Sequence, residues 1–326
     1  MTQLMTFVNA IPGNISQGLI WGILAIGVYI TYKILDFADL TVDGSMATGG
    51  AVCVMLITNN DWSCPVWLAI VCAFAAGCLA GLVTGLLNTL LGIPGILASI
   101  LTQMALYSIN LDIMGQSNRP VSVDKYPLVL SSREVSVIGN EPITIILAIV
   151  KIFVIVAAII AALYWFFGTE YGFTIRTTGC NQNMARAQSI NTKKSTVIAL
   201  VLSNGLVGLS GALLAQYQGN ADVNMARGAI VIGLAAVIIG DVLGNVIFGK
   251  HFNFVARLAF AAIGGIIYFM VLQIVTIIGL PSQNNKLFSA VVVIIFLAVP
   301  YIRKSAKTSF GRAAKNSLKK GAPKDA

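Results

Sequence analysis

The stretch VWLAIVCAFAAGCLAGLVTGLLNTLL, residues 66–91, decides the fold class. It contains no charged residue and exceeds the about 20 residues that a helix needs to cross a bilayer. The rest of the 326-residue chain is similar, since 57% of it is hydrophobic and 10% charged, with a mean hydropathy of +0.86. A soluble domain is about 45–50% apolar and about 25% charged. The composition therefore excludes a water-soluble enzyme, a disordered protein and a nucleic-acid-binding domain, and it predicts an all-α, polytopic transmembrane helical bundle.

Apolar runs on both sides of this stretch predict about 8–10 spans in total. The expected runs are residues 16–34, 45–58, 66–91, 93–114, 142–167, 195–216, 229–248, 255–278 and 288–302. The second run is short and glycine-rich and follows a polar stretch, so we expect one broken or re-entrant helix near residues 36–58. The spans form one transmembrane domain, residues 1–302, which contains a polar loop at 169–194 and precedes a basic tail at 303–326.

The positive charges of the chain predict its orientation. The net charge is +9, and eight of the 21 Lys and Arg residues lie between Arg303 and Lys324. The polar loop adds four bases against Glu170. Because Lys and Arg are enriched in cytoplasmic loops, we expect this loop and the C-terminus to face the cytoplasm.

Small residues recur at helical spacing in two of the expected spans. Gly77, Gly81 and Gly85 share one face of a helix, and Gly208 and Gly211 share a face of another. Small residues at such spacing let transmembrane helices approach closely. We expect these glycines to pack helices together, a feature that transporters share with other membrane proteins.

Polar residues within or beside the spans are candidates for a substrate path, because such residues are costly in a membrane. The candidates are Asp36, Asp39, Asp43, Asn88, Gln103 and Asn204. The three aspartates precede the glycine-rich run, so they either line a path or form a polar interfacial turn. Asp241, inside a later span, either faces a cavity or pairs with a base such as Lys250.

Catalytic motifs are absent from the sequence. It contains no GxxxxGK[ST], HExxH or GxSxG pattern and no CxxC pair, and its one histidine, His251, lies in a short loop. Nucleotide, zinc and acyl-transfer chemistry commonly use these patterns. We therefore expect a chain that is not an enzyme and holds no cofactor or metal.

The polar loop contains the segment GCNQNMARAQSIN, residues 179–191. It is able to form a short helix, and its alanines and amides suit docking into a groove on another protein. The other interpretation is a solvated loop that carries positive-inside charge.

This segment resembles the GxNxxAAxxxGIN pattern of permease subunits of ABC importers of the branched-chain amino acid and ribose type, with Gln182, Arg186 and Ser189 departing from it. Residues 81–102, GLVTGLLNTLLGIPGILASILT, are similar to that family's GxxxGxLxxxxxIPxxIxTL helix pair, and DFADLTVDGS at residues 36–45 is similar to its NFAHG-like turn. The resemblance covers about residues 16–303.

The resemblance implies a permease subunit of an ATP-driven importer for a small organic solute, with an amino acid as the expected solute, in the bacterial cell (inner) membrane. It is closest to permeases that pair with tryptophan- or tyrosine-type binding proteins. The implied partners are a separate ABC ATPase that binds the ATP, an extracytoplasmic substrate-binding protein, a second permease chain (a homodimer) and membrane lipid, with no nucleic acid. The implied ATPase-coupling residues are Gly179, Asn181, Asn183, Ala185, Arg186, Ala187, Ile190 and Asn191.

The alternative is an ATPase-independent secondary transporter or channel. Such a protein needs sites for coupling ions within its spans, and the few charged residues there argue against it.

Overall fold

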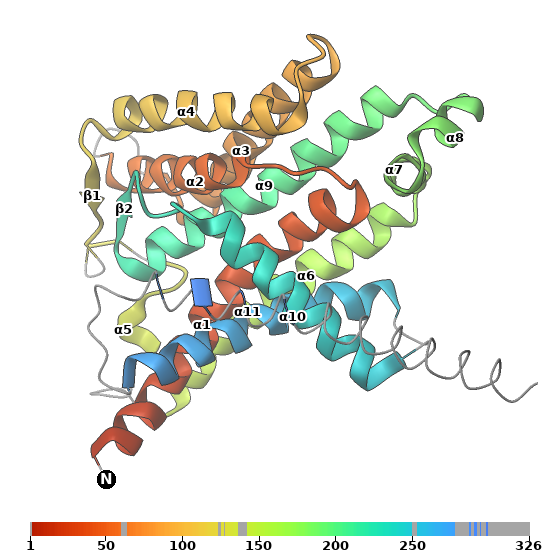
Figure 1. Ribbon diagram of the computed structural model, residues 1–326. Coiled ribbons are helices and arrows are strands. Elements are labelled where there is room, and N and C mark those ends of the chain that lie inside the picture. Colours follow the sequence, from red (N-terminus) through yellow and green to blue (C-terminus); the bar gives the residue numbers. More distant parts are fainter. Residues whose placement is uncertain are drawn as a thin grey trace, which may run out of the picture.

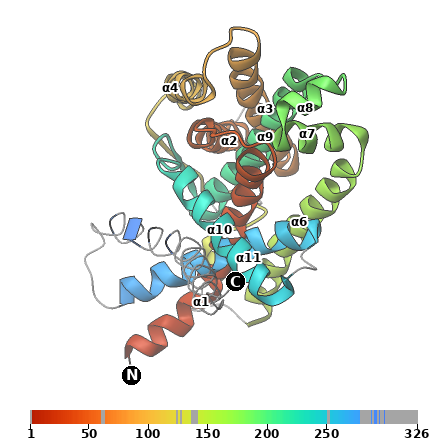
Figure 2. The same ribbon diagram turned by 45° about the vertical axis from the view of Figure 1, so that its right-hand side comes forward.

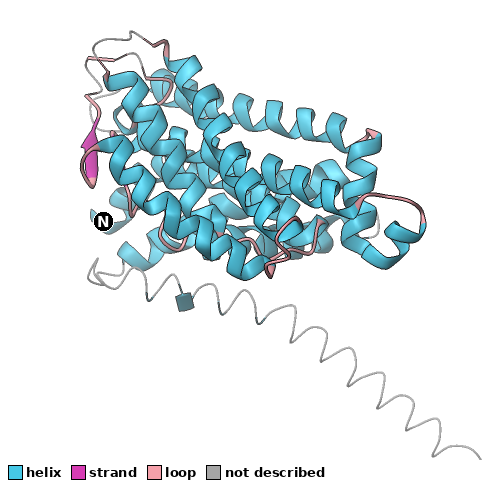
Figure 3. Cartoon of the chain, turned by 90° about the horizontal axis from the view of Figure 1, so that it is seen from above, coloured by secondary structure: helices cyan, strands magenta, loops and turns pink. Residues whose placement is uncertain are grey.

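The computed structural model describes residues 2–59, 64–122, 125–126, 128–135, 142–249 and 253–277, and five single positions between 287 and 298. The expected span at 288–302, apart from four of those positions, lies outside the described residues, as do the basic tail at 303–326 and Lys250 and His251. The described chain is almost entirely helical (Figure 3).

The elements follow one another along the chain as a series of long helices with two short strands. In order they are α1 (Thr2–Tyr29), η1 (Ile30–Ile34), α2 (Thr41–Thr58), α3 (Val66–Thr89), α4 (Gly95–Met114), β1 (Asn118–Pro120), α5 (Ser132–Val135), α6 (Pro142–Phe167), α7 (Glu170–Cys180), α8 (Gln182–Ala187), α9 (Thr192–Gln218), β2 (Asn220–Asp222), α10 (Ala229–Phe248) and α11 (Phe254–Ile277). Within the described residues, eight helices are long and apolar enough to cross a membrane. The predicted helical membrane bundle is therefore confirmed.

Helix α9 lies at the centre of the bundle (Figures 1 and 2). It packs against α3, α2 and α1, while α11 packs against α1 and α10. The spans of α1, α2 and α9 are mostly buried, whereas only 22% of the span of α6 is buried. Many apolar side chains on α3, α4 and α6 are exposed on the surface of the bundle. They suit contact with lipid, because the hydrocarbon of a membrane offers no partners for polar groups.

The predicted break near residues 36–58 is confined to the chain between η1 and α2. Asp36 adopts a left-handed conformation with φ 56°, and the amide of Phe37 donates to the carbonyl of Thr31 over 2.9 Å. Helix α2 then continues unbroken to Thr58 despite its glycines. Gly49 serves close packing there, because a Cβ at this position would collide with the backbone of Gly208.

The two ends of the bundle have different structures. At one end β1 pairs antiparallel with β2, with Asn118 opposite Asp222. At the other end α7 and α8 project from the bundle (Figure 1), and Gly179 packs so tightly on the carbonyl of Ile34 that a Cβ would not fit. The β1–β2 pair and the polar loop thus lie at opposite ends of the bundle.

Candidate functional site

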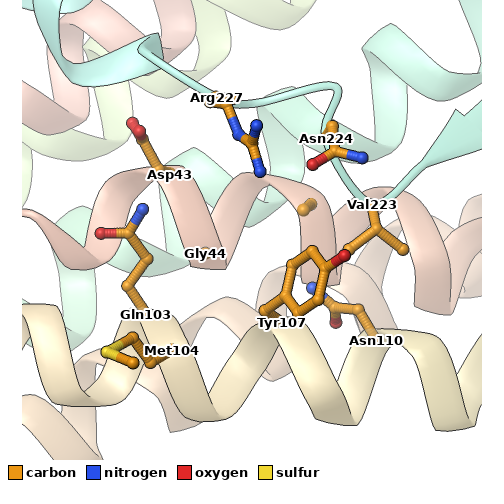
Figure 4. A pocket seen from close by; sticks show the side chains of 10 residues that line it. Asp43, Gly44, Gln103, Met104, Tyr107, Asn110, Val223, Asn224 and Arg227 are labelled. Carbon is orange, nitrogen blue, oxygen red and sulfur yellow. The ribbon is translucent and has the colours of Figure 1, made fainter. Parts of the chain in front are cut away.

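A cavity of about 250 Å³ lies between α2, α4 and the segment 223–227 that precedes α10. Its polar lining residues are Asp43, Gln103, Tyr107, Asn110, Asn224 and Arg227. Figure 4 shows Gln103, Tyr107 and Asn110 rising from α4 toward Asp43 of α2 and toward Asn224 and Arg227. The cavity therefore brings a carboxylate, a guanidinium, three amides and a phenol together between apolar helices.

Asp43 fixes one wall of this cavity. Its carboxylate accepts hydrogen bonds from the backbone amides of Gly228, over 2.8 Å, and Ile230, over 2.9 Å. The first amides of a helix have no intrahelical partner and attract negative charge. Asp43 therefore caps the N-terminus of α10 from a neighbouring helix and holds the segment 223–227 in place.

Two other polar groups of the cavity remain available. Asn110 is only 1% exposed, and neither its amide oxygen nor its amide nitrogen has a hydrogen-bond partner in the described part of the chain. Arg227 is exposed and forms no ion pair with a described residue. A buried amide without a partner is costly, so these groups are suited to bind a polar, charged solute.

A second polar cluster, of Asp39, Ser45 and Asn204, is buried and does not line the cavity. The amide nitrogen of Asn204 donates to the carboxylate of Asp39 over 2.7 Å, and the hydroxyl of Ser45 donates to the amide oxygen of Asn204. The backbone amide of Thr41 donates to the other oxygen of Asp39 over 2.9 Å. Burial raises the pKa of the Asp39 carboxyl, against the effect of the hydrogen bonds from Thr41 and Asn204. This cluster joins the start of α2 to the centre of α9.

The sequence-predicted path residues are thus divided between several places. Asp43 and Gln103 line the cavity, and Asp39 and Asn204 bond each other outside it. Asp36 is exposed in the turn after η1.

Asn88 and Asp241 also lie away from the cavity. The amide of Asn88 donates to the carbonyl of Ile93 over 2.9 Å and so closes the turn between α3 and α4. Asp241 pairs with bases, namely Lys33 at 3.1 Å and Arg257 at 3.9 Å.

The glycines singled out in the sequence lie where helices meet most closely. Gly77 and Gly81 face the carbonyls of Asn204 and Leu200 on α9. Gly85 faces Val197 farther along the same helix.

On the other side of these contacts, Gly208 faces the carbonyl of Ala73, and Gly211 faces that of Met46. The five positions thus form the contact of α9 with α3 and α2.

The segment 179–191 forms the short helix α8 and its two flanks. The side chain of Asn181 accepts from the amides of Asn183 and Met184, both over 3.0 Å, and so caps α8. Asn191 caps α9 in the same way through the amide of Lys194 over 3.1 Å. Asparagine is among the preferred residues at helix N-termini for this reason.

Helix α8 has one buried and one exposed side. Ala185 is 2% exposed and seats the helix on the bundle, whereas Met184 is 61% exposed. Asn183 and Ala187 are also exposed. An exposed methionine between small and amide side chains is suited to insert into an apolar groove.

The flanking residues hold α8 in position. The guanidinium Nε of Arg186 donates to the hydroxyl of Thr192 over 3.2 Å, Ile190 is partly buried, and Gly179 contacts Ile34.

Three cavity residues were not singled out in the sequence: Tyr107, Asn224 and Arg227. Asn110 is recognisable as a polar residue inside an expected span, but it was not assigned to the path. Gln103, Tyr107 and Asn110 recur at i, i+4 and i+7, which places them on one helical face, and this spacing was a usable signal. Nothing in the pattern shows that the segment 223–227 returns into the bundle.

Comparisons with known proteins match the chain to a family model and to several relatives. The family model described as the permease component of branched-chain amino acid transport systems matches residues 12–299. The chain is 39% identical to a tyrosine transport system permease protein of Clostridioides difficile, over 92% of this chain and 94% of that protein. It is 28% identical to the fructose import permease protein FruF of Bifidobacterium longum, over 86% of this chain and 74% of that protein.

A more distant relative is the galactofuranose transporter permease protein YtfT of Escherichia coli, 26% identical over 85% of this chain and 75% of that protein. The comparison with solved structures found no match.

Proposed function

Since the chain belongs to the family of branched-chain amino acid transport system permease components, and so is a non-catalytic membrane subunit of an ABC importer, we propose that it conducts an amino acid through the cavity between α2, α4 and the segment 223–227. The cavity combines groups that suit such a solute with a position between membrane helices.

The observation that carries this proposal is the pair of opposite charges across the cavity. Asp43 lies on α2 and Arg227 on the facing segment. A free amino acid is a zwitterion, so its carboxylate is a partner for the guanidinium of Arg227, a geometry that Arg forms well. Its ammonium group is a partner for Asp43 and for the free amide oxygen of Asn110.

An aromatic amino acid is the preferred solute. The ring of Tyr107 lines the cavity and is 44% exposed, so it is available to stack on an aromatic side chain. The relative from Clostridioides difficile is a tyrosine permease, which supports the same preference.

Energy for transport comes from a partner in this proposal. We assign the docking of a separate ATPase to α8 and its flanks, which include the exposed Asn183, Met184 and Ala187. The end of the bundle that carries α7 and α8 then faces the cytoplasm, in agreement with the positive charge of this loop. An extracytoplasmic binding protein delivers the solute at the β1–β2 end, and a second permease chain completes the path.

Uptake of radiolabelled tyrosine tests the solute and its binding group together. Cells express the ATPase and the binding protein together with either the native chain or the Arg227→Gln variant. We expect uptake at limiting tyrosine to fall about 10- to 100-fold in Arg227→Gln, since a hydrogen bond to a charged group contributes about 1.5–3 kcal/mol.

The matched control is Lys151→Gln, because Lys151 of α6 does not line the cavity and pairs with Glu134 at 3.3 Å on the surface of the bundle. We expect near-native uptake in this variant. Unchanged uptake in Arg227→Gln, or transport of labelled fructose in place of amino acids, would contradict the proposal.

A further inference from the structure

A second cavity, of about 260 Å³, lies at the end of the bundle that carries α7 and α8. It is open to the surface and is lined by residues from the end of α1, η1, α7 and the start of α11. Its charged lining residues are Lys33, Arg176 and Arg257. We propose that this basic cavity binds a phosphate group, supplied by the head group of an anionic phospholipid.

The charges around this cavity do not balance within the described residues. Asp241 is the acid that reaches them, at 3.1 Å from Lys33 Nζ and 3.9 Å from Arg257 Nη1. Arg176 forms no ion pair with any described residue. Three cations against one carboxylate leave an excess of positive charge, which favours an anionic ligand.

Arg176 is held in a geometry that suits a phosphate. Its guanidinium carbon lies 4.4 Å from the ring centroid of Phe254 and 5.4 Å from that of Phe167. Stacking of this kind fixes the guanidinium plane and leaves its edge free to donate hydrogen bonds. The Nε of Arg176 is buried and has no hydrogen-bond partner in the described part of the chain, so a donor is available for a phosphate oxygen.

The position of the cavity favours a lipid over a free anion. Lys33 lies at the end of the first candidate span, and Arg257 lies in the first turn of the last described one. Tyr171 and Phe173 on α7 are 64% and 63% exposed, and aromatic side chains commonly lie at the membrane interface. Basic pockets between transmembrane helices at this level bind lipid head groups.

Cys180 provides a reporter because it lines the cavity and is exposed. The purified full chain is placed in nanodiscs of phosphatidylcholine with increasing phosphatidylglycerol. Modification of Cys180 by a neutral maleimide is then followed by peptide mass spectrometry. We expect phosphatidylglycerol to protect Cys180, and the fraction that gives half-maximal protection to rise about fivefold in Lys33→Gln, which corresponds to about 1 kcal/mol per basic residue.

Two further variants make the test specific. Lys194→Gln removes an exposed lysine at the start of α9, and this lysine does not line the cavity. For this variant we expect half-maximal protection of Cys180 at the same phosphatidylglycerol fraction as for the native chain. Asp241→Asn removes the neutralising acid, and we expect protection at a lower phosphatidylglycerol fraction. This gain of binding is a change that misfolding does not produce.

Inorganic phosphate added to pure phosphatidylcholine discs separates the two possible sources of the group. Protection that requires phosphatidylglycerol supports the lipid. Protection by millimolar inorganic phosphate alone supports the phosphate site and overturns the lipid as its occupant. Absence of protection in both arms, or equal protection in Lys33→Gln and Lys194→Gln, overturns the site. A loss of ATPase association in Lys33→Gln without any change in protection overturns it in favour of an acidic protein partner.

Discussion

Asn204 is the residue on which the buried polar cluster depends. It is fully buried, donates to Asp39 and to the carbonyl of Leu200, and accepts from Ser45. All of its hydrogen-bonding groups are thus used between α2 and α9. Such fully satisfied networks define one arrangement of the helices, whereas a partly satisfied one is costly.

Replacement of Asn204 by alanine removes the partner of a buried carboxylate. We expect Asn204→Ala to lower the free energy of unfolding by about 1.5–3 kcal/mol, the value of a hydrogen bond to a charged group. Thermal unfolding of the purified chain in detergent measures this as a lower midpoint. Asn183→Ala is the matched control, since Asn183 is exposed, and we expect a change within about 0.5 kcal/mol. Equal midpoints for the two variants would contradict this role of Asn204.

The three aspartates show what the sequence can and cannot predict for single residues. Asp36, Asp39 and Asp43 stand at close spacing, and their pattern left a path lining and an interfacial turn open. The structure separates them: Asp36 is exposed, Asp39 is buried against Asn204, and Asp43 lines the cavity. Asp36 and Asp39 lie in the turn between η1 and α2, where Asp36 has a left-handed conformation, whereas Asp43 lies within α2. A single left-handed residue has no periodic signal in the sequence.

At the scale of elements, the contact of α3 with α9 depends on glycines. A Cβ at Gly77 would collide with the carbonyl of Asn204, whereas a Cβ at Gly85 would lie 3.2 Å from Val197. The collision at Gly77 is with a backbone carbonyl, whereas the contact at Gly85, with Cα and Cγ2 of Val197 at 3.2 Å, requires a shift of only a few tenths of an ångström. The two glycines therefore differ in how much volume they tolerate.

This difference predicts unequal effects of the same substitution. We expect Gly77→Ala to destabilise the chain by about 1–3 kcal/mol through overpacking, and Gly85→Ala to cost less than about 1 kcal/mol. The yield of monodisperse protein and the unfolding midpoint in detergent test the order. A Gly85→Ala protein that is less stable than the Gly77→Ala protein would show that another contact limits this interface.

Helix α8 offers a test that separates docking from folding. Ala187 is exposed on α8, and Ala161 is exposed on α6. We expect Ala187→Phe to reduce the amount of co-purified ATPase at least about tenfold, because the added ring prevents close contact at the docking surface. Ala161→Phe, with the same added volume on an exposed face of α6, is expected to retain the ATPase. Similar amounts of ATPase with both variants would move the docking surface away from α8.

The spans were largely predictable from the sequence because hydropathy reports them directly. Residues 229–248 are recovered as α10, and residues 66–91 as α3 with a difference of two residues at its end. The segment 223–227 was not predictable, since its return toward α2 depends on hydrogen bonds from Gly228 and Ile230 to Asp43. These partners are far apart along the chain, and only the packed fold brings them together.

At the scale of the whole molecule, α9 and α2 connect the proposed docking surface on α8 to the cavity proposed for the amino acid. The central helix α9 begins at the cap formed by Asn191, next to α8, and it contacts α2, which carries Asp43. The Asp39–Asn204 hydrogen bond adds a polar link between α9 and the segment that precedes α2. Most of the spans of α4 and α6 is exposed, with only 28% and 22% buried, so these faces are available for contact with lipid.

In the proposed function, α8 docks an ATPase that drives amino-acid transport. A photo-reactive residue at Met184 tests it directly, with one at Phe153 of α6 as the control, because the two side chains are 61% and 60% exposed. Cross-linking is carried out in cells that actively take up tyrosine, and the adducts are identified by mass spectrometry. We predict an adduct between position 184 and a P-loop ATPase, and none from position 153. Tyrosine uptake that continues while position 184 forms no ATPase adduct would contradict the account and favour an ATPase-independent transporter.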